Sequence, residues 1–453
     1  MGKKRDLECK VFRLTNGPKH HLFGFHDLLI SNENDTRLLT LEVDTINRPP
    51  LAGEKFGVGF IEDGTFIKVG DTTALNYPQG ARQQWVAKTD YFTVNNLVEG
   101  RWGTDLYDSS SKKLVERYED TTHMLSKDGR IAYGLDYARL FRLGVYGYAG
   151  VRDIYEDDPI PTKSGITKMD LQTKESTLLV SVKQVAECGY ENNVPLYGHH
   201  YLTHLCVSPN SKRIAFLHRF PMADGGEMTR LMTIGSDGAE LRCLAAGFLS
   251  HFDWKDDETL YIYGRVNSAV ESLRNSPIMN NALMQFSLNM AKKVVRLFIG
   301  NGKSIVASAN SFICITDSNT PTIKPFAKDI IPLDGHPMTC PMDNNWCSLD
   351  TYPNANGIRD LMLYDFNNDE RVNLGTFKMS DEQPDTRLMD LYFAGVDSKI
   401  LQAITPSSLS FTRSGLHCDL HPRWNSKGDK IFFDSIHEGT RQIYYVDVKE
   451  IIS

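Results

Sequence analysis

Seven imperfect copies of one short motif recur along the chain, and this repeat constrains the fold more than any other feature of the sequence. Each copy reads as a short strand, a polar turn rich in Asn, Asp, Ser, Lys and Gly, and a second strand of β-branched and aromatic residues. A third strand follows several copies, at residues 165–181, 281–298, 359–375 and 441–450. The copies begin at His26, Arg82, Thr122, His204, His251, His336 and His421.

Units of this kind are typical of the four-stranded blades of a β-propeller. The copies start 56, 40, 82, 47, 85 and 85 residues apart, whereas a blade usually takes about 40 to 50 residues. The long intervals therefore predict insertions at residues 140–200, 265–330 and 375–417. The last copy is one strand short, and the N-terminal stretch CKVFRLT has the pattern to supply it and close the ring. We predict an all-β, seven-bladed propeller that forms one domain over residues 1–453.

Composition excludes several classes of function. Hydrophobic residues make up 41% of the chain and charged residues 24%, and no apolar run approaches the roughly 18 residues of a membrane span. The net charge is -7 and no basic run is present, so we do not expect nucleic acid as a partner. The eight cysteines are scattered without a Cys-x-x-Cys pair, which indicates reduced thiols and a cytoplasmic protein. No secretory signal is visible; a trimmed signal would make the protein periplasmic or secreted.

Five of the seven copies begin with histidine. In a propeller the innermost strand of each blade borders the central channel, so these histidines would form a ring around one mouth of it, with Arg82 and Thr122 completing the circle. The alternative is structural: each histidine would bond the backbone of the neighbouring blade.

A metal site is one chemical use for such a ring. Asp419 and His421 are two residues apart, which in an extended strand places both side chains on one face. With His251 and His336 they would offer three nitrogens and one oxygen to Mn or Zn, with Ca as an alternative. The alternative role of Asp419 is structural: its carboxylate would accept hydrogen bonds from backbone amides. His417 and Cys418 are weaker candidates, because Cys418 is expected to point away from Asp419.

Residues 197–220 and 135–150 hold the other candidate groups. A neutral histidine is a natural general base, and we assign that role to His204. Arginine or tyrosine neutralises a carboxylate or protonates a leaving group. The expected catalytic residues are His204, Tyr201, Arg219 and His200, with Arg82, His26, Arg142 and Tyr146 as substrate-binding residues. His218 is expected to pack in a strand, and residues 135–150 have a helix packed on the propeller as their alternative.

Several motifs carry a resemblance to a known family. They are the His-x-x-x-Ser-Pro motif at His204, DGHP at 334–337 with DTYP at 350–353, DLHPRW at 419–424, and QGARQQW at 79–85. Together they resemble the propeller polysaccharide lyases, which include oligogalacturonate lyase, ulvan lyases and TolB-like propellers of bacterial polysaccharide loci. The resemblance implies that His204 is the Brønsted base and that His251 and His421 bind metal. Asp419 stands where the family has a histidine, and the family's glutamine is absent.

The resemblance implies a carbon–oxygen lyase that acts by metal-assisted β-elimination on a uronic-acid-containing oligo- or polysaccharide. Such an enzyme removes the proton at C5 and expels the oxygen at C4. Three alternatives stay open: a uronate C5-epimerase, a propeller that binds glycan or protein without catalysis, and a hydrolase, which needs two placed carboxylates. For the hydrolase, Asp350 and Asp434 occupy equivalent repeat positions, which indicates a structural hydrogen bond instead. The insertions are possible sites of a homodimer contact.

Overall fold

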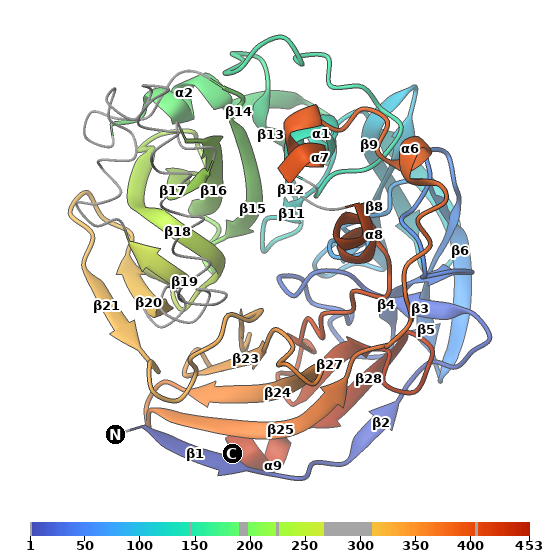
Figure 1. The fold of residues 1–453 in the computed structure, drawn as a ribbon, viewed down its shortest axis with the longest axis vertical. Helices are drawn as coiled ribbons and strands as arrows, with labels where there is room; N and C mark the ends of the chain where they lie inside the picture. Colours follow the sequence, from blue (N-terminus) through green and yellow to red (C-terminus); the bar gives the residue numbers. More distant parts are fainter. Residues whose placement is uncertain (1, 145, 190–197, 223–225, 267–309, 404–405) are drawn as a thin grey trace, which may run out of the picture.

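Short strands dominate the chain. The computed structural model describes residues 2–453 except 145, 190–197, 223–225, 267–309 and 404–405. Within these residues the strands form six hydrogen-bonded sheets that stand around a common centre (Figure 1). The predicted third strand at residues 281–298 lies outside the described residues. In the described part of the chain, no helix has the length and apolar character to cross a membrane.

The first three sheets follow the chain in order, each with four strands. The first contains β3 (His20–Leu22), β4 (Leu38–Val43), β5 (Phe56–Glu62) and β6 (Thr65–Thr72). The second contains β7 (Gln84–Trp85), β8 (Tyr91–Val98), β9 (Arg101–Asp108) and β10 (Lys113–Tyr118). The third contains β11 (Met124–Leu125), β12 (Ile131–Leu135), β13 (Gly165–Asp170) and β14 (Ser176–Ser181).

The fourth sheet has seven strands, because one long strand changes its partner partway. Residues 242–247 of β18 pair with β17, and residues 247–254 pair with β19. The sheet contains β15 (Tyr201–Val207), β16 (Arg213–Pro221), β17 (Glu227–Gly235), β18 (Arg242–Trp254), β19 (Thr259–Val266), β20 (Ser311–Thr316) and β21 (Ile323–Phe326).

The last two sheets each take a strand from the N-terminus. The fifth contains β22 (Met338–Thr339), β23 (Trp346–Asp350), β24 (Ile358–Asp365), β25 (Glu370–Lys378) and β1 (Lys3–Asp6). The sixth contains β26 (Arg423–Trp424), β27 (Lys430–Ser435), β28 (Gln442–Asp447) and β2 (Val11–Arg13). β2 pairs antiparallel with β28, so the N-terminal stretch does supply the strand missing from the last copy. β1 runs parallel to β25, a pairing that the repeat pattern did not indicate.

The repeat hairpins predicted from the sequence are present as antiparallel strand pairs in six of the seven copies. The copy that begins at His26 differs. Its expected inner strand is reduced to one bridge between Ser31 and Leu38, and β3, which precedes the copy, pairs with β4 instead.

Tryptophans at one repeat position join neighbouring copies of the repeat. The indole nitrogens of Trp85, Trp254 and Trp424 donate to backbone oxygens of the preceding copy, at Ile30, Cys206 and Met338, over 3.0, 3.1 and 3.0 Å. Trp254 and Trp424 are at most 2% exposed, so each buries a large apolar ring and satisfies its one polar atom. These bonds hold neighbouring copies together, and thus help to position the residues that begin each copy.

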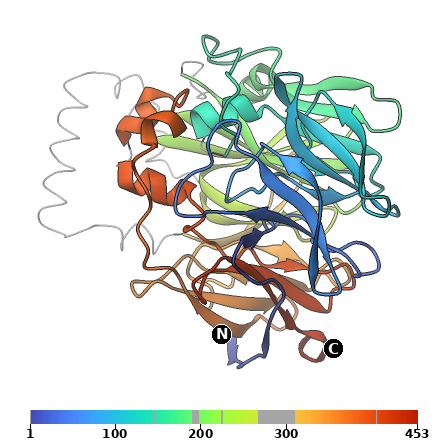
Figure 2. The ribbon, with the colours of Figure 1, turned by 90° about the vertical axis from the view of Figure 1, so that its right-hand side faces the viewer.

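The helices are short. They are α1 (Tyr137–Gly144), α2 (Val182–Glu187), α6 (Met389–Tyr392), α7 (Ser398–Ala403), α8 (Pro406–Arg413) and α9 (Lys449–Ile452). Five of these, α1, α2, α6, α7 and α8, lie in or at the border of the predicted insertions 140–200 and 375–417. Figures 1 and 2 show α6, α7 and α8 together on one side of the sheets. Phe141 of α1 packs with Tyr392 and Phe393, so two insertions distant in sequence share one small apolar cluster.

Candidate active site

Five histidines from five repeat copies converge at the centre of the molecule, around the ring of Phe25. The centroid of the Phe25 ring lies 4.3 to 6.1 Å from the centroids of the rings of His26, His204, His251, His336 and His421. All five histidines are at most 7% exposed. The predicted convergence of the repeat histidines is therefore observed. We call these five residues and Phe25 the histidine cluster.

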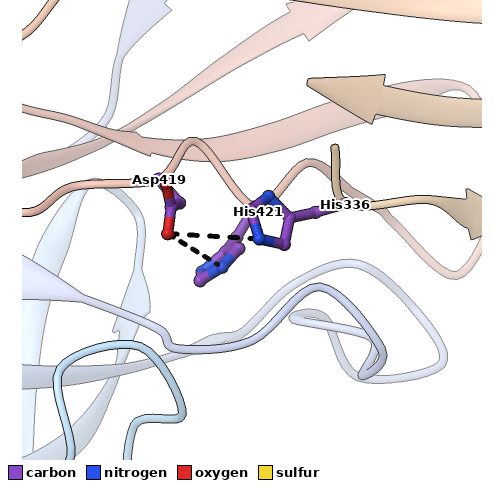
Figure 3. A group of neighbouring side chains, drawn as sticks. All are labelled: His336, Asp419 and His421. Carbon is purple, nitrogen blue, oxygen red and sulfur yellow. Dashed lines mark ion pairs between the residues drawn. The ribbon is translucent and has the colours of Figure 1, made fainter. Parts of the chain in front are cut away.

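Three residues of this region lie close enough to share one cation. Ligand atoms of His336, Asp419 and His421 all fall within 4.8 Å of one another, and all three residues are buried. Oδ2 of Asp419 is 4.0 Å from Nε2 of His336 and 3.8 Å from Nε2 of His421 (Figure 3). His251 lies beside this group, with its ring centroid 4.2 Å from that of His336.

Hydrogen bonds fix the orientation of three imidazole rings. Nδ1 of His336 donates to Asp350 over 2.8 Å, and Nδ1 of His251 donates to Asp334 over 3.1 Å. Nδ1 of His421 donates to the backbone oxygen of Gly24 over 2.9 Å. Because carboxylate and carbonyl oxygens only accept, each Nδ1 carries a proton, and Nε2 is the nitrogen of each ring that can bind a metal. This is the arrangement of metal-binding histidines, whose second nitrogen bonds a carboxylate or a carbonyl.

The bond from His421 to Gly24 bears on the structural alternative for these histidines. The ring does bond the backbone of another copy, as that alternative predicts. Its other nitrogen, Nε2, is buried and has no hydrogen-bond partner among the described residues. One histidine therefore holds two copies together and also presents a lone pair to Asp419.

Charge around Asp419 keeps its carboxyl group ionised. Burial alone would raise the pKa of this carboxyl, but Arg359, followed by His417 and the neighbouring histidines, outweighs burial and holds the pKa well below its usual range. Nη1 of Arg359 lies 2.6 Å from Oδ1 of Asp419. Nδ1 of His417 lies 3.6 Å from Oδ2. Asp419 is thus an ionised oxygen ligand beside the imidazole nitrogens of His336 and His421.

The backbone around the site is unusual where the side chains turn inward. His421 has φ +45, and Arg82 and His204, the first residues of two other copies, have φ +53. Asp419 and His421 precede β26, so they do not belong to the extended strand expected from their spacing. Gly335, directly before His336, has no room for a side chain, because a Cβ atom would lie 1.9 Å from the backbone oxygen of Asp350.

His204 lies at the edge of the histidine cluster nearest two partly exposed residues. Its ring centroid is 5.0 Å from that of Tyr146, and the guanidinium of Arg219 lies 5.9 Å from the Tyr146 ring centroid. Burial, helped by the charge of Arg219, lowers the pKa of His204 well below its usual value. His204 is therefore neutral near neutral pH, as a general base must be.

Two other predicted catalytic residues lie next to His204 but already have partners. The hydroxyl of Tyr201 donates to Glu227 over 2.7 Å. Nη1 of Arg219 lies 3.6 Å from the same carboxylate. Burial and Glu227 raise the pKa of Tyr201 well above its usual value, so this phenol stays protonated.

His200 lies in a different environment from the histidine cluster. Its Nδ1 is 3.0 Å from Nε2 of His218, and its ring stacks on Phe220. His218 is buried in β16, as expected for a packed strand residue. This contact set belongs to the sheet interior, and it gives His200 a packing role.

The arginines predicted to bind substrate are held by carboxylates. Arg82 is 1% exposed, pairs with both oxygens of Asp27 over 2.8 and 3.0 Å, and donates to the backbone oxygen of His123. Arg142, in α1, donates to Asp153 over 2.8 Å. The helix expected as the alternative for residues 135–150 is present as α1, and Tyr146 lies just beyond it.

The predicted site residues do not include four residues of this region, although Asp334 and Tyr352 lie in the DGHP and DTYP motifs. Phe25 fills the centre, Asp334 orients His251, and Arg359 and Tyr352 flank Asp419 and His336. Asp350 was expected to make a structural hydrogen bond, and it accepts from the backbone nitrogens of both His336 and His421. Cys418 packs in the hydrophobic core, and burial raises the pKa of its thiol to about 11, so it faces away from the site as expected. All eight cysteines are free.

The donor atoms fit a divalent transition metal. Two imidazole nitrogens and one carboxylate oxygen converge, His251 stands next to them, and the outer nitrogens are already oriented. Imidazole nitrogen with carboxylate suits Mn or Zn, whereas Ca takes oxygen ligands throughout. The buried Nε2 of His421, without a hydrogen-bond partner among the described residues, is the atom that a cation would satisfy.

The arrangement of the sheets around a common centre indicates a propeller-like fold, and comparison with solved structures agrees. No protein-family model and no curated protein sequence matches the chain. An oligogalacturonate lyase solved in complex with manganese matches 97% of this chain and 93% of its own, with a TM-score of 0.55 and 14% identity. The oligogalacturonate lyase of Vibrio parahaemolyticus matches 98% of this chain and 95% of its own, with a TM-score of 0.56 and 12% identity.

This likeness shows that the chain has a propeller-like fold similar to that of the oligogalacturonate lyases. At these identities it shows the fold alone. The resemblance inferred from the sequence motifs thus has its structural counterpart over nearly the whole chain.

Proposed function

We propose that the protein is a metal-dependent polysaccharide lyase that cleaves a uronic-acid-containing oligo- or polysaccharide by β-elimination. The observation that carries the proposal is the group of His336, Asp419 and His421, with oriented rings, beside a neutral buried His204. We further propose that the seven-stranded sheet counts as two blades that share β18, which brings the total to seven, and that the pairing of β2 with β28 closes the ring.

In the proposed reaction, His336, Asp419, His421 and the neighbouring His251 would hold Mn or Zn. A bound divalent cation supplies positive charge that stabilises negative charge developing on the uronate carboxylate. His204 would take the proton from C5, and its low pKa keeps it neutral and ready to do so. The electron pair left at C5 then forms the C4–C5 double bond as the oxygen at C4 leaves.

The test is an elimination assay with Mn- or Zn-loaded protein on uronate oligomers. We expect a product whose conjugated double bond absorbs in the ultraviolet. His204→Ala is expected to lose this activity and keep its metal, whereas His421→Ala loses both. His437→Ala is a matched control, because His437 is a histidine of the same repeat copy that bonds Ser435 and packs on Phe377 and Tyr444.

Full activity of His204→Ala, or no product from any uronate oligomer with metal-loaded wild type, would refute the lyase proposal. In the second case, NMR of the recovered sugar tests for inversion at C5, because an epimerase starts with the same proton abstraction. A protein that contains no metal at all would favour a propeller that only binds.

A further inference from the structure

Arg359 uses only part of its hydrogen-bonding capacity. The residue lies on β24 and is 1% exposed. Its Nη1 lies 2.6 Å from Asp419 and donates to the backbone oxygen of Thr351 over 3.3 Å. Within the described residues, neither Nε nor Nη2 has a hydrogen-bond partner, although both are buried.

Nε and Nη2 together form one edge of the planar guanidinium group, with two parallel N–H bonds. That edge matches the two oxygens of a carboxylate, which is why arginine binds carboxylates in a bidentate manner. Leaving buried charged donors unpaired is costly, so native proteins pair almost all of them. The free edge of Arg359 is therefore arranged for an anion.

Its position connects this edge to the proposed chemistry. The carboxylate of Asp419 bridges Arg359 on one oxygen and the two ligand histidines on the other. Tyr352, whose ring centroid is 5.9 Å from the guanidinium, and His417 are neighbours of this region with partial exposure to solvent. An acidic sugar bound next to Tyr352 and His417 would lie close to the guanidinium of Arg359 and to the metal-ligand candidates.

The arginines expected from the sequence do not offer such an edge. Arg82 uses Nε and both terminal nitrogens on Asp27 and the His123 backbone. Arg142 is held by Asp153 and His199. We propose that Arg359 is a specificity-determining residue that binds the carboxylate of a uronic acid residue through Nε and Nη2. This inference rests on the proposed function for the nature of the sugar, and on the unpaired edge for the presence of an anion site.

Binding without turnover tests the proposal separately from catalysis. Calorimetry with the full-length Mn-loaded protein would compare galacturonate, which has no sugar to expel at C4, with neutral galactose and with inorganic sulfate. We expect wild type to prefer galacturonate, and Arg359→Gln to bind it about tenfold to hundredfold more weakly. Arg359→Lys, which keeps the charge without the planar edge, should recover only part of the loss.

Arg371→Gln is the matched control. Arg371 lies on the neighbouring strand β25, is 15% exposed at its side chain, and pairs with Asp360 over 2.8 Å, outside the histidine cluster. This variant is expected to bind galacturonate like wild type. Thermal unfolding shows whether each variant is folded.

A crystal structure of wild type soaked with galacturonate gives a readout that does not depend on any variant. A carboxylate oxygen at hydrogen-bond distance from Nε or Nη2 of Arg359 supports the proposal, and a carboxylate bound elsewhere overturns it. Equal binding by Arg359→Gln and wild type, or sulfate bound with no preference for galacturonate, also overturns it. If the protein has lyase activity but does not prefer galacturonate to galactose or sulfate, the proposed role of Arg359 is wrong and the proposed function stands. If galacturonate binds at Arg359 but the protein has no lyase activity, the role of Arg359 stands and the proposed function is wrong.

Discussion

Replacing Asp350 by asparagine tests whether the site depends on oriented rings. Asp350 is fully buried and accepts three hydrogen bonds: from the backbone nitrogen of His336, from Nδ1 of the same residue, each over 2.8 Å, and from the backbone nitrogen of His421 over 3.1 Å. One carboxylate therefore fixes two metal-ligand candidates that come from different repeat copies.

An asparagine of the same shape has one acceptor oxygen and a donor group in place of the other. At least one buried N–H then loses its partner, which costs about 1–3 kcal/mol, and the remaining bonds lose their charge. We expect Asp350→Asn to lower the free energy of unfolding by about 3 kcal/mol. The loss of ring orientation should weaken binding of Mn by about 10- to 100-fold.

The assays are urea unfolding for stability and calorimetric titration with Mn for affinity. Asp365→Asn is the matched control: Asp365 lies on β24 of the same sheet, is 5% exposed, and accepts three bonds, two from the backbone of Asn367 and Asn368 and one from the side chain of Asn368. It should lose similar stability and keep its affinity for Mn. If Asp350→Asn binds Mn with an affinity within about twofold of wild type, the hydrogen bonds that Asp350 accepts from His336 and His421 do not determine the affinity for Mn, and this prediction is wrong.

Three further outcomes follow from features of the fold and site. Gly335→Ala should destabilise the protein by more than about 2 kcal/mol in urea unfolding, because its Cβ would meet the backbone oxygen of Asp350, whereas Gly375→Ala, whose nearest neighbours lie at 3.5 Å, should cost little. Burial lowers the pKa of His218 well below 6.5, so below about pH 6.5 the unfolded chain binds a proton at this residue and the folded protein does not. The free energy of unfolding therefore decreases as the pH is lowered, by up to about 1.4 kcal/mol per pH unit. His218→Gln should reduce this slope in unfolding curves taken from about pH 7 to 5. Adding Mn at about 100 times its dissociation constant should raise the free energy of unfolding by about 2.7 kcal/mol, and equal stabilisation of His421→Ala would count against these ligands.

The strand pattern was predictable because each hairpin has its own local signal. Alternating apolar residues and a polar turn specify two paired strands wherever they occur, and six of the repeat copies have them. The copy at His26 departed from the prediction, because its apolar stretch makes one bridge and the neighbouring β3 takes its place. Sequence periodicity does not distinguish two adjacent apolar stretches that compete for one partner strand.

The sequence predicted the site only for residues that occupy equivalent positions in the repeat copies. Histidines at one repeat position converge because equivalent positions of a circular repeat share one radius. Asp419 and His421 also come together, but through a bend with φ +45 at His421 and not through an extended strand. Arg359 occupies a charged position in an otherwise ordinary strand, and Phe25 has no counterpart in the other copies, so only the assembled molecule brings out their roles.

The bond between Nδ1 of His421 and the oxygen of Gly24 joins residues 397 positions apart, and β2 and β28 pair across a similar span. During synthesis the first partner emerges from the ribosome early and waits for almost the whole chain before the second appears. The proposed metal site can therefore assemble only after the ribosome has made the chain as far as His421, although Gly24 is among the first residues to be synthesised.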